Sequence, residues 1–328
     1  MKIIWNITKK CGYSCDICAT YSERKELTEI EKAKALNSLL SLNKDYIKEI
    51  DFSGGDPLSD SESINIIYEA IRKLGKDKIS VTTTGRGIIN AIEMKEDLSK
   101  LLYNCELTID SVGDVLNYLR GDVSYVPSNR IVISEVSTYI HKLTINVPII
   151  NPRMSEQDIK HLVKVIESIK VDNIYVNLIR LMNVGRMNAH PNSDDYSPVF
   201  FIQTFMKYAS NSCIKNVHVN CALRGRLYNS KCNMLIDKVG IDCAGNVFAC
   251  AWGGYIDGFS PDRITENPFY LGNLLNETLV EILAGVRANC LKDSISNKPT
   301  AHCRVYCYNY SSAHDIFENK DPLLSSES

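Results

Sequence analysis

Short apolar, β-branched runs alternate with longer amphipathic stretches over the first 180 residues. The runs have the length and composition of buried strands, and stretches such as SINIIYEAIRKLG repeat apolar residues with the helical period. The predicted strands cover residues 2–8, 47–53, 78–85, 105–110, 142–150 and 173–181. A β-α-β-α order favours a parallel sheet with helices outside it, as an open wound sheet or an incomplete barrel. In both architectures, we expect the catalytic and binding residues at the carboxyl ends of the strands.

This alternation ends near residue 212, after an Asn-, Asp-, Ser- and Pro-rich connection and one more helix. Beyond it the chain carries most of its cysteines, a hairpin-like run at 238–252 with Ala-Gly-Asn at its turn, and a short helix at 275–290. We therefore predict an α/β barrel-like domain, a small α+β cysteine-rich domain and a polar tail that frays. Their boundaries are 1–212, 213–315 and 316–328.

The charges of the chain are nearly balanced, with 37 Lys and Arg against 39 Asp and Glu. No basic run breaks this balance, so the sequence predicts neither a nucleic-acid partner nor a membrane surface, and favours a peptide or small-molecule substrate. No apolar stretch approaches the roughly 20 residues of a membrane span, and the N-terminus lacks a signal peptide, so we expect a cytoplasmic protein. Twelve cysteines in a reducing compartment indicate metal ligation or redox chemistry.

Three cysteines follow the first predicted strand in the run CGYSCDIC. Cys11, Cys15 and Cys18 are close enough in sequence for their thiolates to hold one face of a metal cluster. Zinc and ordinary ferredoxin clusters usually take four protein ligands, and no fourth cysteine or histidine lies nearby in the sequence. Three ligands leave one iron open to a chelating group, such as the amino and carboxylate groups of an amino acid. The alternative is structural zinc or an accidental grouping of buried thiols.

The spacing of these cysteines resembles the signature of the radical S-adenosylmethionine (SAM) superfamily, and the resemblance covers about residues 2–212. It implies a partial (β/α)6 barrel of the TIM type in which the three cysteines hold a SAM-binding 4Fe-4S cluster. It also implies the chemistry of the family, in which reductive cleavage of SAM gives a 5′-deoxyadenosyl radical that abstracts hydrogen from a substrate. Such an enzyme needs an electron donor such as flavodoxin or ferredoxin.

Other segments match this family in order. FSGGDPL resembles its Gly-Gly-Glu-Pro motif, with Asp in place of Glu, and LIRLMNVGRMN resembles a segment that ends in Gly-Arg and lies along the adenine and methionine. The resemblance assigns SAM binding to Gly54, Gly55, Asp56, Pro57, Thr84, Asn146, Arg180 and Leu181. Asp110, in a segment that resembles the fourth-strand motif of the family, is the candidate catalytic carboxylate.

A second cysteine group has the pattern Cys-x12-Gly-x4-Cys, from Cys232 to Cys250, followed by the distant pair CRVYC. It resembles the SPASM and twitch domains that are appended to radical SAM enzymes, and so does the phrase YLGNLLNETLVEIL. The cysteines of a second auxiliary cluster are missing, so we expect one auxiliary 4Fe-4S cluster. Its expected ligands are Cys232, Cys250, Cys303 and Cys307, with Cys243 and Cys290 as substitutes and a structural zinc site as the alternative. Cys105, Cys213 and Cys221 have no such spacing and are interpreted as buried apolar thiols, although Cys213 or Cys221 could donate a hydrogen atom.

Two substrate classes remain open after this comparison. The resemblance favours modification of a ribosomally made peptide by crosslinking, epimerisation or oxidation. The alternative is a twitch-type dehydrogenase of a small molecule such as an aminocyclitol, and a third hypothesis is a non-catalytic iron-sulfur or zinc protein. The first strand starts at Lys2. A leader peptide would then be bound by a separate recognition protein or by the barrel mouth.

Overall fold

The computed structural model describes residues 1–109, 120–121, 125–150, 154–186, 198–228 and 230–325. Within this part of the chain, ten strands form one continuous sheet in the order β10-β9-β8-β1-β2-β3-β4-β5-β6-β7. The strands are β1 (Lys2–Thr8), β2 (Glu49–Gly54), β3 (Ile79–Thr83), β4 (Asn104–Thr108), β5 (Lys142–Ile149), β6 (Ile174–Arg180), β7 (Asn216–Val219), β8 (Lys238–Ile241), β9 (Asn246–Phe248) and β10 (Tyr270–Asn273). Neighbouring strands from β8 through β1 to β7 are parallel, whereas β9 is antiparallel to β8 and to β10.

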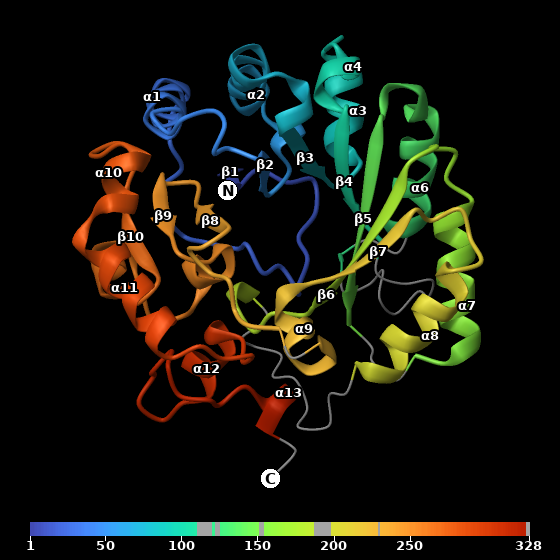
Figure 1. Ribbon diagram of the computed structural model, residues 1–328. Coiled ribbons are helices and arrows are strands. Elements are labelled where there is room, and N and C mark those ends of the chain that lie inside the picture. Colours follow the sequence, from blue (N-terminus) through green and yellow to red (C-terminus); the bar gives the residue numbers. More distant parts are fainter. Residues whose placement is uncertain (110–119, 122–124, 151–153, 187–197, 229, 326–328) are drawn as a thin grey trace.

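Helices lie around the outside of the curved parallel sheet, and the C-terminal elements lie beside β8 to β10 (Figure 1). The α-helices are α1 (Glu29–Leu39), α2 (Ser61–Leu74), α3 (Arg86–Glu93), α4 (Leu98–Leu101), α6 (Tyr125–Glu135), α7 (Glu156–Glu167), α8 (Val199–Ala209), α9 (Cys221–Tyr228), α10 (Leu279–Ala284), α11 (Val286–Asn297), α12 (Arg304–Tyr310) and α13 (Pro322–Ser325). This arrangement confirms the predicted α/β class, with a partial barrel and a small cysteine-bearing C-terminal unit. None of the described helices is both long and apolar enough to cross a membrane.

Two parts of the chain differ from the sequence prediction. The periodicity does not predict β7, a short strand with largely open side chains that pairs with β6 and continues the parallel sheet to residue 219. The segment predicted as a frayed tail is packed at its start, since Asp321 is 1% and Leu323 5% exposed. The described part of this segment, up to residue 325, therefore packs as part of the folded unit.

The two faces of the parallel strands have opposite polarity. Ile3, Trp5 and Ile50 are fully buried and belong to one apolar core together with residues of the outer helices. Lys2 and Asp51 belong to the same two strands but line a cavity inside the barrel. Successive side chains of a strand point to opposite faces, so alternation in β1 and β2 gives the barrel an apolar outside and a polar interior.

Candidate active site

One cavity of about 610 Å³ occupies the barrel interior and opens at the carboxyl ends of the strands. Its walls include the three cysteines of the N-terminal motif, the glycine pair that follows β2, and two cysteines from the C-terminal part of the chain. These residues are Cys11, Cys15, Cys18, Gly54, Gly55, Cys221 and Cys250. The fold therefore brings the two cysteine groups to a single cavity although more than 200 residues separate them.

The loop that carries the N-terminal cysteines is held by the Gly-Arg segment after β6. The Arg186 guanidinium donates to the Cys15 carbonyl at 3.1 Å, and the Arg186 amide donates to the Cys18 carbonyl at 3.0 Å. Gly185 has a positive φ of 61°, and a Cβ at this position would lie 2.6 Å from the Cys18 carbonyl oxygen. Only glycine permits this close approach. The segment expected along the adenine and methionine thus contacts the cysteine loop directly.

The glycine pair after β2 packs against the end of β1. Gly54 has φ 126°, and a Cβ there would lie 2.3 Å from the Thr8 carbonyl oxygen. A Cβ on Gly55 would lie 2.2 Å from the Lys10 carbonyl oxygen, and the Gly55 amide donates to Thr8 at 2.7 Å. Side chains would separate the two backbones, so both glycines are needed to place this turn beside the cysteine loop.

Asp56 is fully buried and connects the ends of β2 and β3. Its carboxylate accepts hydrogen bonds from the Thr84 amide at 2.8 Å, the Thr84 hydroxyl at 2.6 Å and the Gly87 amide at 3.1 Å. Thr84 lines the cavity, whereas Asp56 and Pro57 are not among the cavity residues. Asp56 is therefore a positioning residue. A Cβ on Gly87 would lie 2.1 Å from its carboxylate, and this tight enclosure suits Asp rather than a longer Glu.

The cavity wall also contains Asn146, Arg180 and Leu181, three residues to which the resemblance assigns SAM binding. Arg180 is 3% exposed, pairs with Asp321 at 2.7 Å and lies 3.5 Å from the centre of the Tyr306 ring. Burial lowers the pKa of Arg180, but Tyr306 and Asp321 raise it by more in total, so the net shift is upward and the guanidinium stays charged. Two C-terminal residues thus fix a barrel side chain in place. Asp110 lies outside the described residues.

One more cysteine, Cys221, lies near the C-terminal cysteines, although its position in the sequence did not predict this. The Cys221 thiol is within electrostatic range of Cys232, Cys250 and Cys303. Cys221 begins α9, directly after β7, and Lys238 donates to its sulfur at 3.1 Å. Burial raises the pKa of Cys250 to about 12, so its ionisation requires a cationic partner such as a metal centre.

The other candidate thiols have different surroundings. Cys307 is fully buried, and the charged groups that act on it are Asp321 and Arg304 rather than another cysteine. Cys243 is buried beside Asp242, and Cys290 is exposed on α11. In the described chain, no three Cys, His, Asp or Glu side chains converge tightly enough to hold a single metal ion. Thiolates that bind separate irons of one cluster need not converge on one point, so the donor set fits an iron-sulfur cluster.

Comparisons with known proteins agree with these two sites. Residues 3–115 match a family model described as a 4Fe-4S single cluster domain, and residues 232–308 match SPASM, an iron-sulfur cluster-binding domain. Pre-heme d1 synthase of Dinoroseobacter shibae is 22% identical over 194 residues, which are 58% of this chain and 46% of that protein. The match thus spans less than half of this relative.

Solved structures share the fold over nearly the whole chain. Streptococcus suis SuiB bound to precursor peptide SuiA has a TM-score of 0.70 at 14% identity, covering 98% of this chain and 75% of SuiB. Native anSMEcpe with bound AdoMet and Cp18Cys peptide has a TM-score of 0.62 at 15% identity, covering 99% of this chain and 93% of the other.

The fold and the family models show a chain built on an α/β barrel, with an N-terminal 4Fe-4S single cluster domain and a C-terminal iron-sulfur cluster-binding domain. The order of these domains and the shared fold agree with the resemblance to radical SAM enzymes that carry a C-terminal SPASM-type domain. Both matched families are iron-sulfur cluster domains, and SuiB has also been solved bound to S-adenosylmethionine.

Proposed function

We propose that this chain reductively cleaves SAM at Cys11, Cys15 and Cys18 and uses the resulting radical to modify a peptide. The observation that carries the proposal is the single cavity bordered by both cysteine groups. Cys11, Cys15 and Cys18 would hold a 4Fe-4S cluster with an open iron, and the cluster would supply the electron for SAM cleavage and thereby hydrogen abstraction from the substrate.

The residues of the chain position these groups. Gly54 and Gly55 present backbone atoms at the cavity wall, and Asp56 holds the Thr84 loop beside them. Arg180, fixed by Asp321, offers a permanent charge on the cavity wall. The barrel encloses the cavity and keeps water from a reactive intermediate, which is the usual task of the protein in radical chemistry.

We assign the auxiliary cluster to four thiols that share one electrostatic environment, with Cys221 in place of Cys307. The set is Cys221, Cys232, Cys250 and Cys303. The Cys303 amide donates to Asp321 at 2.9 Å, and Asp321 also pairs with Arg180. One carboxylate therefore links the auxiliary site to the wall assigned to SAM.

The peptide class is supported by two similar structures that contain a precursor peptide or a Cp18Cys peptide. A small-molecule substrate is the second candidate, because the sequence relative is a pre-heme d1 synthase. A flavodoxin- or ferredoxin-type electron donor and a separate peptide-recognition protein are the proposed partners. A short open reading frame beside the gene would support the peptide, and genes for small-molecule synthesis would support the alternative.

The test is iron content and SAM cleavage after anaerobic reconstitution. Wild type is expected to hold about eight irons, and the Cys11→Ala/Cys15→Ala/Cys18→Ala variant about four, with loss of 5′-deoxyadenosine release in dithionite and SAM. Cys213→Ala, which removes an exposed cysteine, is the control that should match wild type. Full deoxyadenosine release by the triple variant would contradict the proposal.

The ligand assignment is tested separately by Cys221→Ala and Cys307→Ala. The first is expected to lose the auxiliary cluster, leaving about four irons, and the second to retain it. Electron paramagnetic resonance of the reduced proteins distinguishes loss of a cluster from altered ligation. Loss of the auxiliary cluster in Cys307→Ala, together with its retention in Cys221→Ala, would instead support the ligand set predicted from the sequence.

A further inference from the structure

The floor of the catalytic cavity is made of charged side chains from the middle of the barrel strands. Asp51 and Glu106 line the cavity from β2 and β4, and Lys2 reaches them from β1. The Lys2 ammonium lies 3.3 Å from Glu106 and 3.9 Å from Asp51, and 2.9 Å from a third carboxylate, Glu49. Three carboxylates thus surround one ammonium.

One buried acceptor atom on this floor has no hydrogen-bond donor among the described residues, and a second acceptor has only a long ion pair. Asp51 is 5% exposed, and its Oδ1 accepts from the Thr82 hydroxyl at 2.9 Å, whereas its Oδ2 has only the distant Lys2 ammonium. The Asn177 Oδ1 atom is buried and accepts nothing, while its Nδ2 donates to Asn146 at 3.1 Å. A buried acceptor without a donor is costly, and a ligand that brings donors would satisfy Asn177 and give Asp51 a closer partner.

The excess of carboxylates over ammonium groups on this floor also favours a bound cation. Burial and the nearby Glu106 raise the pKa of Asp51 to about 7, against the opposing effect of Lys2. The other charged groups around this network are Glu49 on β2 and Lys142 on β5, which acts on Glu49. A further positive charge beside Asp51 would favour its ionised form.

We propose that Asp51, Glu106 and Asn177 form a specificity subsite that binds a basic group of the substrate, an ammonium or a guanidinium. Both groups carry several donors and no acceptor, which complements the carboxylate and amide oxygens of these three side chains. Asp51 precedes Gly54 by three residues, so the subsite lies on the order of 10 Å below the glycine turn at the usual rise along a strand. The inference rests on the proposed function, since the same cavity must admit the substrate.

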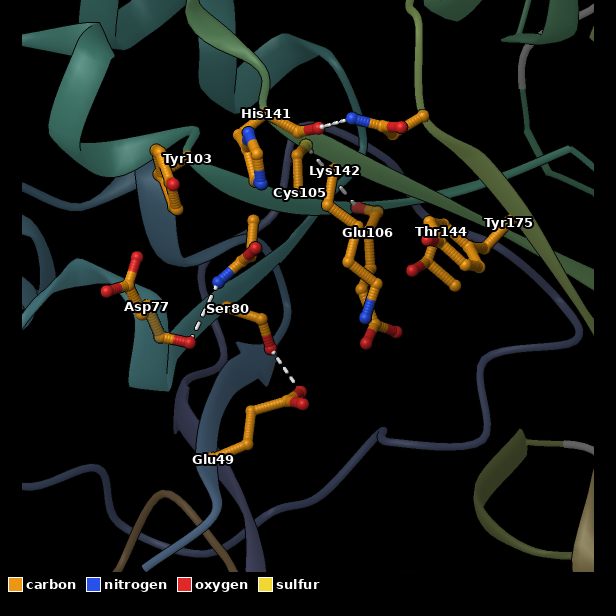
Figure 2. A pocket seen from close by; sticks show the side chains of 12 residues that line it. Glu49, Asp77, Ser80, Tyr103, Cys105, Glu106, His141, Lys142, Thr144 and Tyr175 are labelled. Carbon is orange, nitrogen blue, oxygen red and sulfur yellow. Dashed lines mark hydrogen bonds between the residues drawn. The ribbon is translucent and has the colours of Figure 1, made fainter. Parts of the chain in front are cut away.

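Glu49 offers a matched control because it belongs to the same Lys2 network but faces another cavity. It lines a hollow of about 510 Å³ that Glu106 also borders, and it accepts a hydrogen bond from Ser80 at 2.8 Å (Figure 2). Glu49 is absent from the lining of the catalytic cavity. Its removal weakens the network around Lys2 without taking a carboxylate from the proposed subsite.

The experiment measures binding of n-butylammonium, n-butylguanidinium and n-butanol to the reconstituted holoenzyme with SAM, by saturation-transfer NMR titration. We expect both cations to bind more tightly than n-butanol, and the stronger of the two identifies the preferred basic group. Asp51→Asn and Glu106→Gln should each weaken cation binding by about tenfold or more, as expected for a lost charge-assisted hydrogen bond. Glu49→Gln should change cation binding by less than about threefold, because Glu49 lies outside the subsite and screening weakens the effect of its charge.

Equal binding of n-butanol and the cations would overturn the inference, and so would equal losses in Asp51→Asn and Glu49→Gln. If Asp51→Asn fails to fold, Glu106→Gln against Glu49→Gln decides the same question. Deoxyadenosine release by wild type tests the proposed function independently. A wild type that cleaves SAM but does not prefer the cations would refute this subsite alone.

Discussion

Lys32 shows how a single buried charge stabilises the N-terminal part of the barrel. Its side chain is fully buried, and its ammonium lies 2.9 Å from both Asp60 and Glu26. Replacement by an apolar side chain would leave these carboxylates with fewer partners, and breaking a buried pair typically costs about 3–5 kcal/mol. Asp60 keeps a second partner in Lys10, at 2.6 Å.

We therefore predict that Lys32→Met lowers the free energy of unfolding by about 3 kcal/mol, at the low end for a broken buried pair. Chemical denaturation measures the change. Lys34→Met, at an exposed position of the same helix, is the control and should change stability by less than about 0.5 kcal/mol. A similar loss in both variants would contradict this explanation.

A second residue-scale prediction concerns the enclosure of Asp56. The family motif that this segment resembles has Glu here, but the carboxylate is confined by the Thr84 loop and Gly87. We predict that Asp56→Glu lowers the free energy of unfolding by about 1–3 kcal/mol through overpacking, and weakens SAM binding by displacing Thr84. Denaturation and SAM titration measure the two effects. Asp45→Glu, at an exposed carboxylate, should affect neither.

At the scale of elements, the contact between β8 and the turn after β9 positions the auxiliary cysteines. A Cβ on Gly240 would lie 2.3 Å from the Cα of Ala251, which directly follows Cys250. Gly240→Ala must therefore push the turn away from the strand. We predict loss of about four irons with retention of the N-terminal cluster, as measured by iron analysis. Equal iron content in this variant and wild type would show that the turn tolerates the displacement.

At the scale of the whole molecule, the continuous sheet buries charges that make its stability depend on pH. Asp51 has a folded-state pKa of about 7, above the usual value near 3.9, because of burial and Glu106. The folded protein therefore holds a proton that the unfolded chain has already released. The contribution of this proton is fully present below about pH 4 and is lost as the pH rises through about 7.

We accordingly predict that Asp51→Asn gains thermal stability relative to wild type as the pH rises from about 5 to about 8. The measurement is the difference in unfolding midpoint between the two proteins at each pH. Lys2, Glu49, Glu106 and Lys142 surround this site and remain in both proteins. A difference that does not change with pH would show that Asp51 is ionised throughout this range.

The sequence by itself determined the features that depend on neighbouring residues. The alternation of strands and helices predicted the α/β class, because periodicity reports which face of an element is buried. The spacing of Cys11, Cys15 and Cys18 and the glycines of the turn after β2 predicted the N-terminal site, since both are local requirements of backbone and ligand geometry. The missed strand β7 is short and open, so it carries little periodic signal.

Only the tertiary structure decided which distant residues meet. Cys221 joins the auxiliary cysteines because β7 and α9 place it there, and no spacing in the chain encodes that approach. Lys2, Asp51 and Glu106 meet because β1, β2 and β4 present alternate side chains to one barrel interior. Strand order and register set such contacts, and these depend on the packing of the whole sheet rather than on any local pattern.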